Sequence, residues 1–478
     1  MKKNVLTNAI IAGVAGIAGL ASVANAVNLN PDGLGQVLIY PYYTVNGGNQ
    51  TLLSVVNTTD VGKAVKVRFL EGYNSREVLD FNLYLSPYDV WTAAIFQTSD
   101  TSAANLITSD QSCTVPKIPA GGVAFVNFQY TGANNDAGPD SVTRTREGHF
   151  EIIEMAEIIN AAGGEGSLSA ITHAGGVPDN CAQVVSAWNA GGYWVADQTI
   201  DTRVPGGGLF GSGFIVDPAN GTLIGYNAEA IDSFSAEVLH FNPGSTRPAL
   251  KDANTTITTT DAIVFDSAGL VTSTYPRATQ AIDAVSAVFS HDAIFNEFVT
   301  SAGAGATSEW VVTFPTKNAY VDHPAPVTPP FDFVFGAPGT SPVTATFTIF
   351  DREERTLLPE DVGFSPPPPD GADTTIDWET NVVTINQPGF AGGSAILGSN
   401  LAVNVEPDGF GIFDGWMRIG FDDAAHVSRP DSVGGTYLGL PVVGFWAVNF
   451  NGAGVPGILA NYAGAFRHRG SRQYTIAP

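Results

Sequence analysis

Short segments in which apolar and polar residues alternate constrain this chain more than any other feature of its sequence. In KAVKVRF, the apolar side chains of Val65, Val67 and Phe69 fall on one side of an extended strand. The two cations between them, Lys66 and Arg68, fall on the other side. A repeat of two is the spacing of a β-strand, and similar segments separated by turn residues recur at short intervals. The pattern predicts an antiparallel sandwich or barrel.

The same pattern, followed along the chain, predicts how the domains are organised. Later segments such as TATFTIFD, VVTIN and GFWAVNF resume the β pattern, and 53 glycines and 30 prolines supply the turns. Strand-sized segments joined by such turns are typical of all-β folds. We therefore expect a mainly β protein with two β-sandwich-like domains, an N-terminal one at residues 27–160 and a larger one at 161–478.

One stretch, residues 277–301, interrupts the strand pattern. Its apolar residues, Val285 and Val288 among them, recur at helical spacing. Ser290 or Asp292 could cap a second short helix after the first. We expect a small helical insertion here, within the second domain.

The segment EWVVTFPTKNAYVD joins a predicted strand to one of the few lysines. Trp310, Val312 and Phe314 fall on one face of the strand, and Pro315 ends it or marks a sheet edge. Lys317 follows at a turn. A catalytic lysine needs burial or a neighbouring cation to lower its pKa, and nothing local supplies either. We expect Lys317 to be exposed.

The segment EIIEMAEIINAAGG carries three regularly spaced carboxylates, Glu151, Glu154 and Glu157. In a helix they would share one exposed face. A strand with Phe150, Ile152 and Glu154 on one side is the alternative. Two carboxylates brought together by a fold can perform acid–base catalysis, and Glu151 and Glu154 are the nominees for such a pair.

The N-terminus has the features of an export signal. In MKKNVLTNAIIAGVAGIAGLASVANA, two lysines precede an apolar, small-residue stretch that ends in an A-x-A site at 24–26. This pattern predicts a signal peptide over residues 1–26, cut before Val27. The mature chain contains no other membrane-spanning candidate. We expect an exported protein at the cell surface or outside the cell, with the periplasm as the alternative.

Cysteine usage agrees with export, because the two cysteines, Cys113 and Cys181, are expected to pair in an oxidising compartment. Their disulfide would close a loop of about 68 residues. In the chain-entropy model such a bridge stabilises the fold by about 4 kcal/mol.

The acidic balance excludes one class of partner and suggests another. The chain has 46 acidic and 21 basic residues, a formal charge of −25, which disfavours binding to nucleic acid. Carboxylates in loops can bind calcium. The candidate ligands are Asp370, Asp373 and Asp377 in one loop and Asp136 and Asp140 in another. The alternative is ordinary turn chemistry in solvated loops. No other cofactor is indicated.

Aromatic clusters provide candidate binding residues. Tyr40, Tyr42 and Tyr43 lie near the mature start, and Tyr193 and Trp194 follow two glycines. Exposed rings of this kind stack on sugars or anchor interfaces, whereas most strand aromatics belong to the core. The C-terminal FRHRGSR segment adds cations to an acidic protein. It could contact an acidic surface of another subunit, in self-assembly, or anionic cell-surface glycans.

Several segments resemble a set of uncharacterised exported, surface-type proteins of Gram-negative bacteria. They are the YPYYTV start, AVKVRFLEGYNSREVLDFNLYLSPYDVW, TREGHFEIIEMAEI, THAGGVPDNC and NEFVTSAGAGATSEWVVTFPTKNAYVD. The likeness extends over most of the mature chain and implies one family module. It implies no activity, cofactor or site residue.

The residues therefore favour a secreted or cell-surface protein with a structural, adhesive or assembly role and no catalytic activity. The chain lacks a G-x-S-x-G elbow, an H-E-x-x-H motif and a P-loop. The alternative is a secreted hydrolase that acts on polysaccharide through paired carboxylates.

Overall fold

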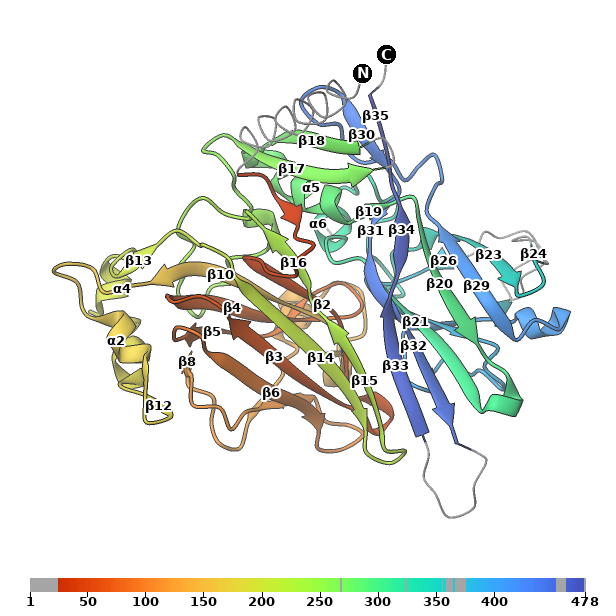
Figure 1. Cartoon of the computed structure of the whole chain (residues 1–478), viewed down its shortest axis with the longest axis horizontal. Coiled ribbons are helices and arrows are strands. Elements are labelled where there is room, and N and C mark those ends of the chain that lie inside the picture. Colours follow the sequence, from red (N-terminus) through yellow and green to blue (C-terminus); the bar gives the residue numbers. More distant parts are fainter. Residues whose placement is uncertain are drawn as a thin grey trace, which may run out of the picture.

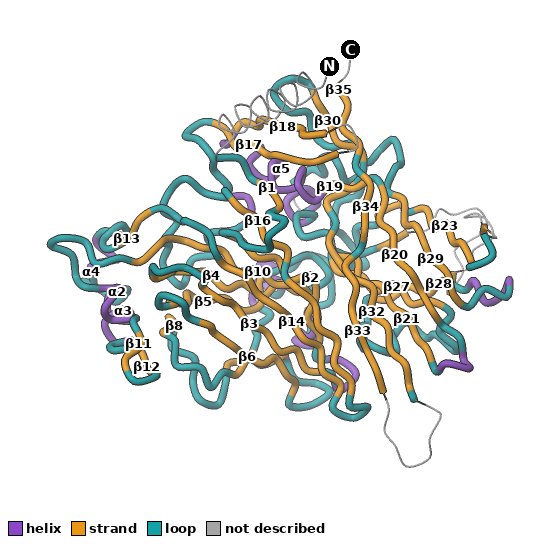
Figure 2. The backbone as a smooth tube through the Cα atoms, in the orientation of Figure 1, coloured by secondary structure: helices purple, strands orange, loops and turns teal. Residues whose placement is uncertain are grey.

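The computed structural model of the chain describes residues 25–266, 269–322, 325–354, 356–357, 364–365, 375–452 and 461–476. It is built mainly from antiparallel sheets, as the alternation predicts (Figure 1). Strands dominate both halves of the molecule, and the helices are short pieces near the centre and along the periphery (Figure 2). Over the described ranges, no helix is both long enough and apolar enough to cross a bilayer.

The first half contains two sheets. One has the order β1 (Asn28–Leu29), β16 (Glu229–Asp232), β2 (Val37–Thr44), β10 (Glu147–Ile158), β4 (Gly62–Glu71), β5 (Glu77–Leu85) and β8 (Cys113–Val115), and β13 (Thr202–Arg203) pairs with β10. The other has the order β15 (Thr222–Asn227), β14 (Leu209–Asp217), β3 (Gln50–Asn57), β6 (Val90–Gln97), β7 (Ala104–Ile107) and β9 (Val123–Ala124). We call these sheets together the first sandwich.

The predicted alternation in β4 is present. Val65 and Val67 join the core between the two sheets of the first sandwich. Lys66 and Arg68 lie on the opposite face, yet they are buried too, because the second half of the molecule covers that face. A strand with both faces covered has to bury its charges in ion pairs.

The first sandwich takes strands from beyond the predicted domain boundary at residue 160. Strands β14, β15 and β16, all after residue 200, complete its two sheets. Between β10 and β14 the chain makes an excursion with α2 (Ser167–Ile171), the hairpin β11–β12 (His173–Ala174, Val177–Pro178), α3 (Cys181–Ala187) and α4 (Tyr193–Ala196). The predicted disulfide between Cys113 and Cys181 is confirmed, and it ties α3 to β8.

The second half also contains two large sheets. A five-stranded sheet has the order β24 (Thr356–Leu357), β23 (Thr346–Asp351), β29 (Asp414–Gly420), β20 (Ala293–Val299) and β34 (Arg469–Ser471). A six-stranded sheet has the order β25 (Phe364–Ser365), β28 (Ala402–Val405), β27 (Thr380–Ile385), β21 (Ala306–Thr313), β32 (Val443–Asn451) and β33 (Asn461–Arg467). Ile349 and Met417 from one sheet and Trp310 and Val383 from the other share a buried cluster. These sheets form the second sandwich.

Helix α5 (Arg277–Phe289) confirms the first part of the predicted helical insertion. It packs against the hairpin β17–β18 (Thr259–Asp266, Gly269–Pro276). Short pairs complete this region: β19–β31 (Ser290–His291, Leu440–Pro441), β22–β26 (Val343–Thr344, Thr375–Ile376) and β30–β35 (Gly435–Leu438, Gln473–Ile476). Helix α6 (Asn318–Val321) follows Lys317.

The second helix predicted after Ser290 is wrong, because the chain continues as β19 and β20. Residues 293–299 pair along their whole length with β29. The segment is short and rich in apolar residues, so its pattern fits both the helical period of 3.6 residues and the strand period of two. The backbone pairing offered by β29 decides in favour of the strand.

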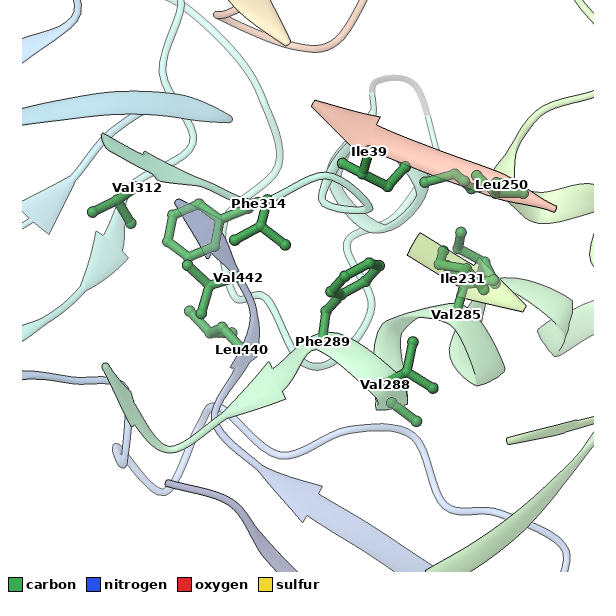
Figure 3. Close-up of a cluster of buried hydrophobic side chains, with 14 of the residues drawn as sticks. Ile39, Ile231, Leu250, Val285, Val288, Phe289, Val312, Phe314, Leu440 and Val442 are labelled. Carbon is green, nitrogen blue, oxygen red and sulfur yellow. The ribbon is translucent and has the colours of Figure 1, made fainter. Parts of the chain in front are cut away.

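The two sandwiches share one core. Figure 3 shows Ile39 of β2 and Ile231 of β16 close to Phe289 of α5, with Phe314 and Val442 of the second half continuing the same cluster. A contiguous set of buried contacts, rather than a linker, joins the halves.

Candidate functional site

The tyrosines predicted as binding residues lie inside the first sandwich. Tyr40, Tyr42 and Tyr43 on β2 are fully buried. Tyr40 stacks on Phe150 with ring centroids 4.1 Å apart. Strand β2 is central in its sheet and covered on both faces, so these rings fill the core and are not an exposed stacking platform.

The second predicted aromatic pair belongs to the excursion between β10 and β14. Trp194 is buried, and its indole nitrogen donates to the carbonyl oxygen of Ile200 at 2.9 Å. Tyr193 is half-buried, and its hydroxyl lies 3.0 Å from the Ser167 hydroxyl. Trp194 also stacks on Tyr84 of β5 with centroids 5.3 Å apart. These rings anchor the excursion to the first sandwich.

The carboxylates Glu151 and Glu154 lie on strand β10, so the helical alternative is wrong and the strand alternative is confirmed. Along β10, Ile152 faces the core of the first sandwich, and Ile153 faces the cluster shared by both halves. Glu154 is two residues from Ile152, and Glu151 is two residues from Ile153. The two carboxylates therefore point to opposite faces of the sheet and cannot act on one bond.

Each of these carboxylates has its own cation. Glu151 accepts a hydrogen bond from Arg68, beside a hollow of about 620 Å³ between the halves. Glu154 accepts one from Lys63 at 2.9 Å and one from the backbone N–H of Gly207 at 2.7 Å. Burial raises the pKa of both carboxyl groups, and the paired cations oppose that shift.

Lys317, predicted to be exposed, is fully buried. Its ammonium donates to the carbonyl oxygens of Ser341 at 2.6 Å and Trp378 at 3.1 Å. Burial lowers the pKa of Lys317 to about 8, and the nearby Glu379 carboxylate partly offsets this effect. Glu379 accepts a hydrogen bond from Ser75 of the first sandwich. The turn after Pro315 thus folds inward and places this lysine where the two halves meet.

Of the predicted calcium ligands, the structure describes Asp136, Asp140 and Asp377. Asp136 is buried against Arg144, whose guanidinium donates to it at 2.6 Å. Asp140 is exposed, and Asp377 is half-buried. The remaining two, Asp370 and Asp373, lie outside the described residues. Within the described ranges, no group of three or more His, Cys, Asp or Glu side chains is placed to hold a metal ion.

A large hollow of about 1220 Å³ lies over the second sheet of the first sandwich, bordered by the disulfide. Its lining is mostly small and aliphatic, with Phe214 as its aromatic ring and Asp110 and Lys117 as its charges. Asp110 is engaged locally, because it accepts from the Ser112 hydroxyl at 2.8 Å. Ten of its lining residues are polar, but Phe214 is the one aromatic ring among them, so we do not treat this hollow as a site for ring stacking.

The stronger candidate is a groove of about 650 Å³ in the second sandwich, where β33 meets β20 and β29. We call it the aromatic groove, and its defining side chains are Phe295, Trp416, Tyr462, Phe466, Arg467 and Arg469. Trp416, Tyr462 and Phe466 are 39%, 68% and 53% exposed, respectively. Large rings left in solvent are uncommon enough to require a reason when they share one hollow.

One wall of the aromatic groove is the edge strand β33. Tyr462, Gly464 and Phe466 occupy alternate positions, so they share one side of the strand. At about 3.3 Å per residue the Cα atoms of Tyr462 and Phe466 stand roughly 13 Å apart along the strand. A Cβ at Gly464 would meet the Phe466 ring at 3.6 Å, so this ring leans over the glycine. The result is a slot whose strand wall carries two aromatic rings.

The opposite wall carries Trp416 in a fixed orientation. Its indole stacks on Phe350 of β23 with centroids 4.2 Å apart and planes 7° apart. Phe295 of β20 contacts it from the other side, with centroids 6.3 Å apart. Because neighbouring rings hold the indole, it loses little conformational entropy when a ligand stacks on it.

The cations of the C-terminal segment lie at the end of the aromatic groove. The Arg467 side chain is 61% exposed although it pairs with Glu229 at 2.6 Å, and Arg469 is exposed. Between them His468 is half-buried: one ring nitrogen lies 3.0 Å from the Val311 carbonyl oxygen and the other 3.1 Å from the Asn296 amide. Desolvation lowers the pKa of His468 to about 4. These two contacts anchor the β33–β34 turn between the two exposed arginines.

Sequence reasoning missed the groove, although two patterns point to it. In NYAGAFR, rings at alternate positions flank a glycine, and in DGWMRIG the polar side of the strand includes Trp416. Neither pattern indicates that β33 is an edge strand, and that position is what leaves its rings uncovered. Comparisons with protein family models, curated proteins and solved structures found no match to this chain.

Proposed function

We propose that this chain is an exported, non-catalytic adhesive protein of the cell surface or extracellular space, and that it holds an acidic saccharide chain in the aromatic groove. The observation that carries this proposal is the set of exposed rings, Trp416, Tyr462 and Phe466, that share one open slot. The flat apolar faces of sugar rings stack on such side chains. The predicted signal peptide and the disulfide support export.

The charges around the groove favour an acidic sugar. Arg467 and Arg469 are exposed at its end on a chain whose formal charge is −25. A guanidinium binds a carboxylate or sulfate in a bidentate manner. Salt screens exposed charges beyond about 8 Å at physiological ionic strength, so the charges at the groove itself decide the preference. Arg467 is already paired with Glu229 at 2.6 Å, and Arg469 is therefore the principal cation for an acidic group.

The lining of the groove supports binding rather than cleavage. Of the described residues that line it, Glu297 is the one carboxylate. Hydrolysis of a glycosidic bond ordinarily needs two carboxyl groups on either side of the bond. The groove therefore has the rings and cations to hold a saccharide and lacks the acid–base pair to cut it.

The experiment compares binding of the mature chain to an acidic polysaccharide, such as a polyuronate, with binding to a neutral glucan by titration calorimetry. Trp416→Ala and Tyr462→Ala should each weaken binding to the polyuronate about tenfold or more, since stacking of a ring contributes on the order of 1–1.5 kcal/mol beyond its burial. Phe265→Ala removes an exposed ring outside the groove and should leave affinity unchanged.

Arg469→Gln should weaken binding and reduce its dependence on salt. Incubation with the polyuronate should produce no new reducing ends. Equal affinity of the parent chain and both groove variants would contradict the proposal. Release of new reducing ends would support a hydrolase instead, and concentration-dependent self-association lost in Tyr462→Ala would assign the rings to assembly.

A further inference from the structure

Val27, the residue that follows the predicted cleavage site, is built into the fold. Its side chain is fully buried. Its backbone nitrogen donates to the carbonyl oxygen of Asp261 at 2.8 Å, and its carbonyl oxygen accepts from the backbone nitrogen of Ile263 at 2.9 Å. The next residues, β1, pair with β16. The start of the predicted mature chain is therefore a core segment.

This placement restricts when the signal peptide can be removed. A peptidase must bind the residues on both sides of the bond that it cuts, but Ala26 and Val27 are both buried in the folded chain. Cleavage of the Ala26–Val27 bond must therefore come before β1 docks. Hydrolysis by water leaves a carboxylate on Ala26 and an amine on Val27, and the amine takes up a proton at neutral pH.

The freed ammonium of Val27 needs a counter-charge, because an unpaired charge in a buried position is strongly destabilising. Asp261 is the neighbour whose carbonyl oxygen already accepts from this nitrogen. One carboxylate oxygen of Asp261, Oδ1, is buried and makes no hydrogen bond within the described part of the chain. An orphaned buried acceptor thus belongs to the residue beside the nitrogen that becomes charged.

We infer that the α-ammonium freed at Val27 binds the Asp261 carboxylate, and that this ion pair locks β1 onto β17 in the exported protein. Removal of the signal peptide then does more than release the chain, because it creates the cation that completes the core at its N-terminal edge. The inference depends on cleavage before Val27 and is independent of saccharide binding.

The test uses the full mature chain in two forms. One begins at Val27, and the other retains Asn25 and Ala26, which leaves an uncharged amide at Val27. Intact mass should show that the exported protein begins at Val27. Its equilibrium constant for unfolding, from urea titration at pH 7, should be lower than that of the extended form by about tenfold or more, as expected for completing a buried ion pair.

Asp261→Asn should abolish the difference between the two forms, whereas Asp60→Asn, on an exposed turn, should preserve it. Hydrogen exchange of the Ile263 amide, which reports on β1 docking without any substitution, should be slower in the form that begins at Val27. Equal stability and equal exchange of the two forms, a difference that survives Asp261→Asn, or a different N-terminus in the exported protein would each overturn the inference.

Discussion

Two aromatic regions of this molecule, built from the same residue types, have opposite surroundings. In the first sandwich Tyr40, Tyr43 and Phe150 stack within the core and are fully buried. In the second sandwich Tyr462 and Phe466 stand in solvent at the aromatic groove. The difference comes from sheet position: β2 and β10 are central strands covered on both faces, whereas β33 is an edge strand. The aromatic residues in a region do not by themselves indicate whether that region can bind a ligand.

Charged side chains differ between the two regions in the same way as the aromatic rings do. In the first sandwich Arg144 is buried between Glu71 and Asp136, where it serves the fold. At the groove Arg467 and Arg469 remain exposed and can meet a ligand. The comparison predicts that substitutions in the first region change stability, and that substitutions in the second change binding.

The largest effect is expected from Arg144→Met. Its guanidinium donates to Glu71 and Asp136, each at 2.6 Å. Its loss removes the cation that Glu71 is paired with and leaves Asp136 with the more distant Arg76 at 3.5 Å. We expect the free energy of unfolding to fall by about 5 kcal/mol, the upper end for breaking a buried pair. Urea denaturation measures it. Arg352→Met breaks an exposed pair with Asp414 and should cost at most about 1 kcal/mol. Similar losses in the free energy of unfolding for Arg144→Met and Arg352→Met would contradict the expected difference between buried and exposed ion pairs.

Phe150→Ala should produce the next largest effect. The ring packs between Tyr40 and Phe69, with centroids 4.1 Å and 5.0 Å away. Its removal leaves a cavity in a close-packed core, and we expect a loss of about 4 kcal/mol in the free energy of unfolding. Saccharide affinity of the folded fraction should not change. A loss of affinity without a loss of stability would show that the first region, too, contributes to binding.

Acid should weaken the fold through His468, by an intermediate amount. Desolvation lowers the pKa of this histidine to about 4 in the folded chain, so the unfolded chain, with a pKa near 6.5, takes up the proton first as pH falls. Stability is therefore present above about pH 6.5 and is lost toward pH 4, by about 2 kcal/mol at pH 5. Urea denaturation at pH 7 and pH 5 measures this, and His468→Gln should show a smaller loss than the parent. An unchanged pH dependence in the variant would exclude His468 as the cause.

Phe466→Ala should have the smallest effect on stability, within about 0.5 kcal/mol, because the ring is largely exposed. It should still reduce saccharide affinity, as measured by calorimetry beside Phe150→Ala. Phe150→Ala and Phe466→Ala test the comparison most directly, because the same substitution removes a ring from a covered strand and from an uncovered strand. A large loss of stability in Phe466→Ala would place this ring in the core.

Sequence reasoning succeeded where the physical cause is local. Alternation in KAVKVRF predicts β4 because side chains of a strand point to opposite faces. Two cysteines in a chain with a predicted signal peptide are expected to pair, and the structure confirms the disulfide. It failed where one short pattern fits two periods: Glu151 and Glu154 have helical spacing yet lie on β10, and residues 293–299 form β20. In both cases backbone pairing with distant strands decides.

The candidate site could not be predicted because its members are distant in sequence. Phe295 and Trp416 lie on neighbouring strands of the five-stranded sheet, and Phe466 lies on the six-stranded sheet. Sheet order and the packing of the two sheets together place them at one groove. Lys317 shows the same limit, since the carbonyl oxygens that hold it belong to residues 341 and 378.

By itself, the sequence determined the β class and the disulfide, because each depends on neighbouring residues or on composition. Export remains a prediction from the N-terminal pattern. Only the tertiary structure decided which strands are covered and which lie at an edge. That choice separates the buried tyrosines of β2 from the exposed rings of β33, because a side chain binds a ligand only on a surface that no other part of the chain has covered.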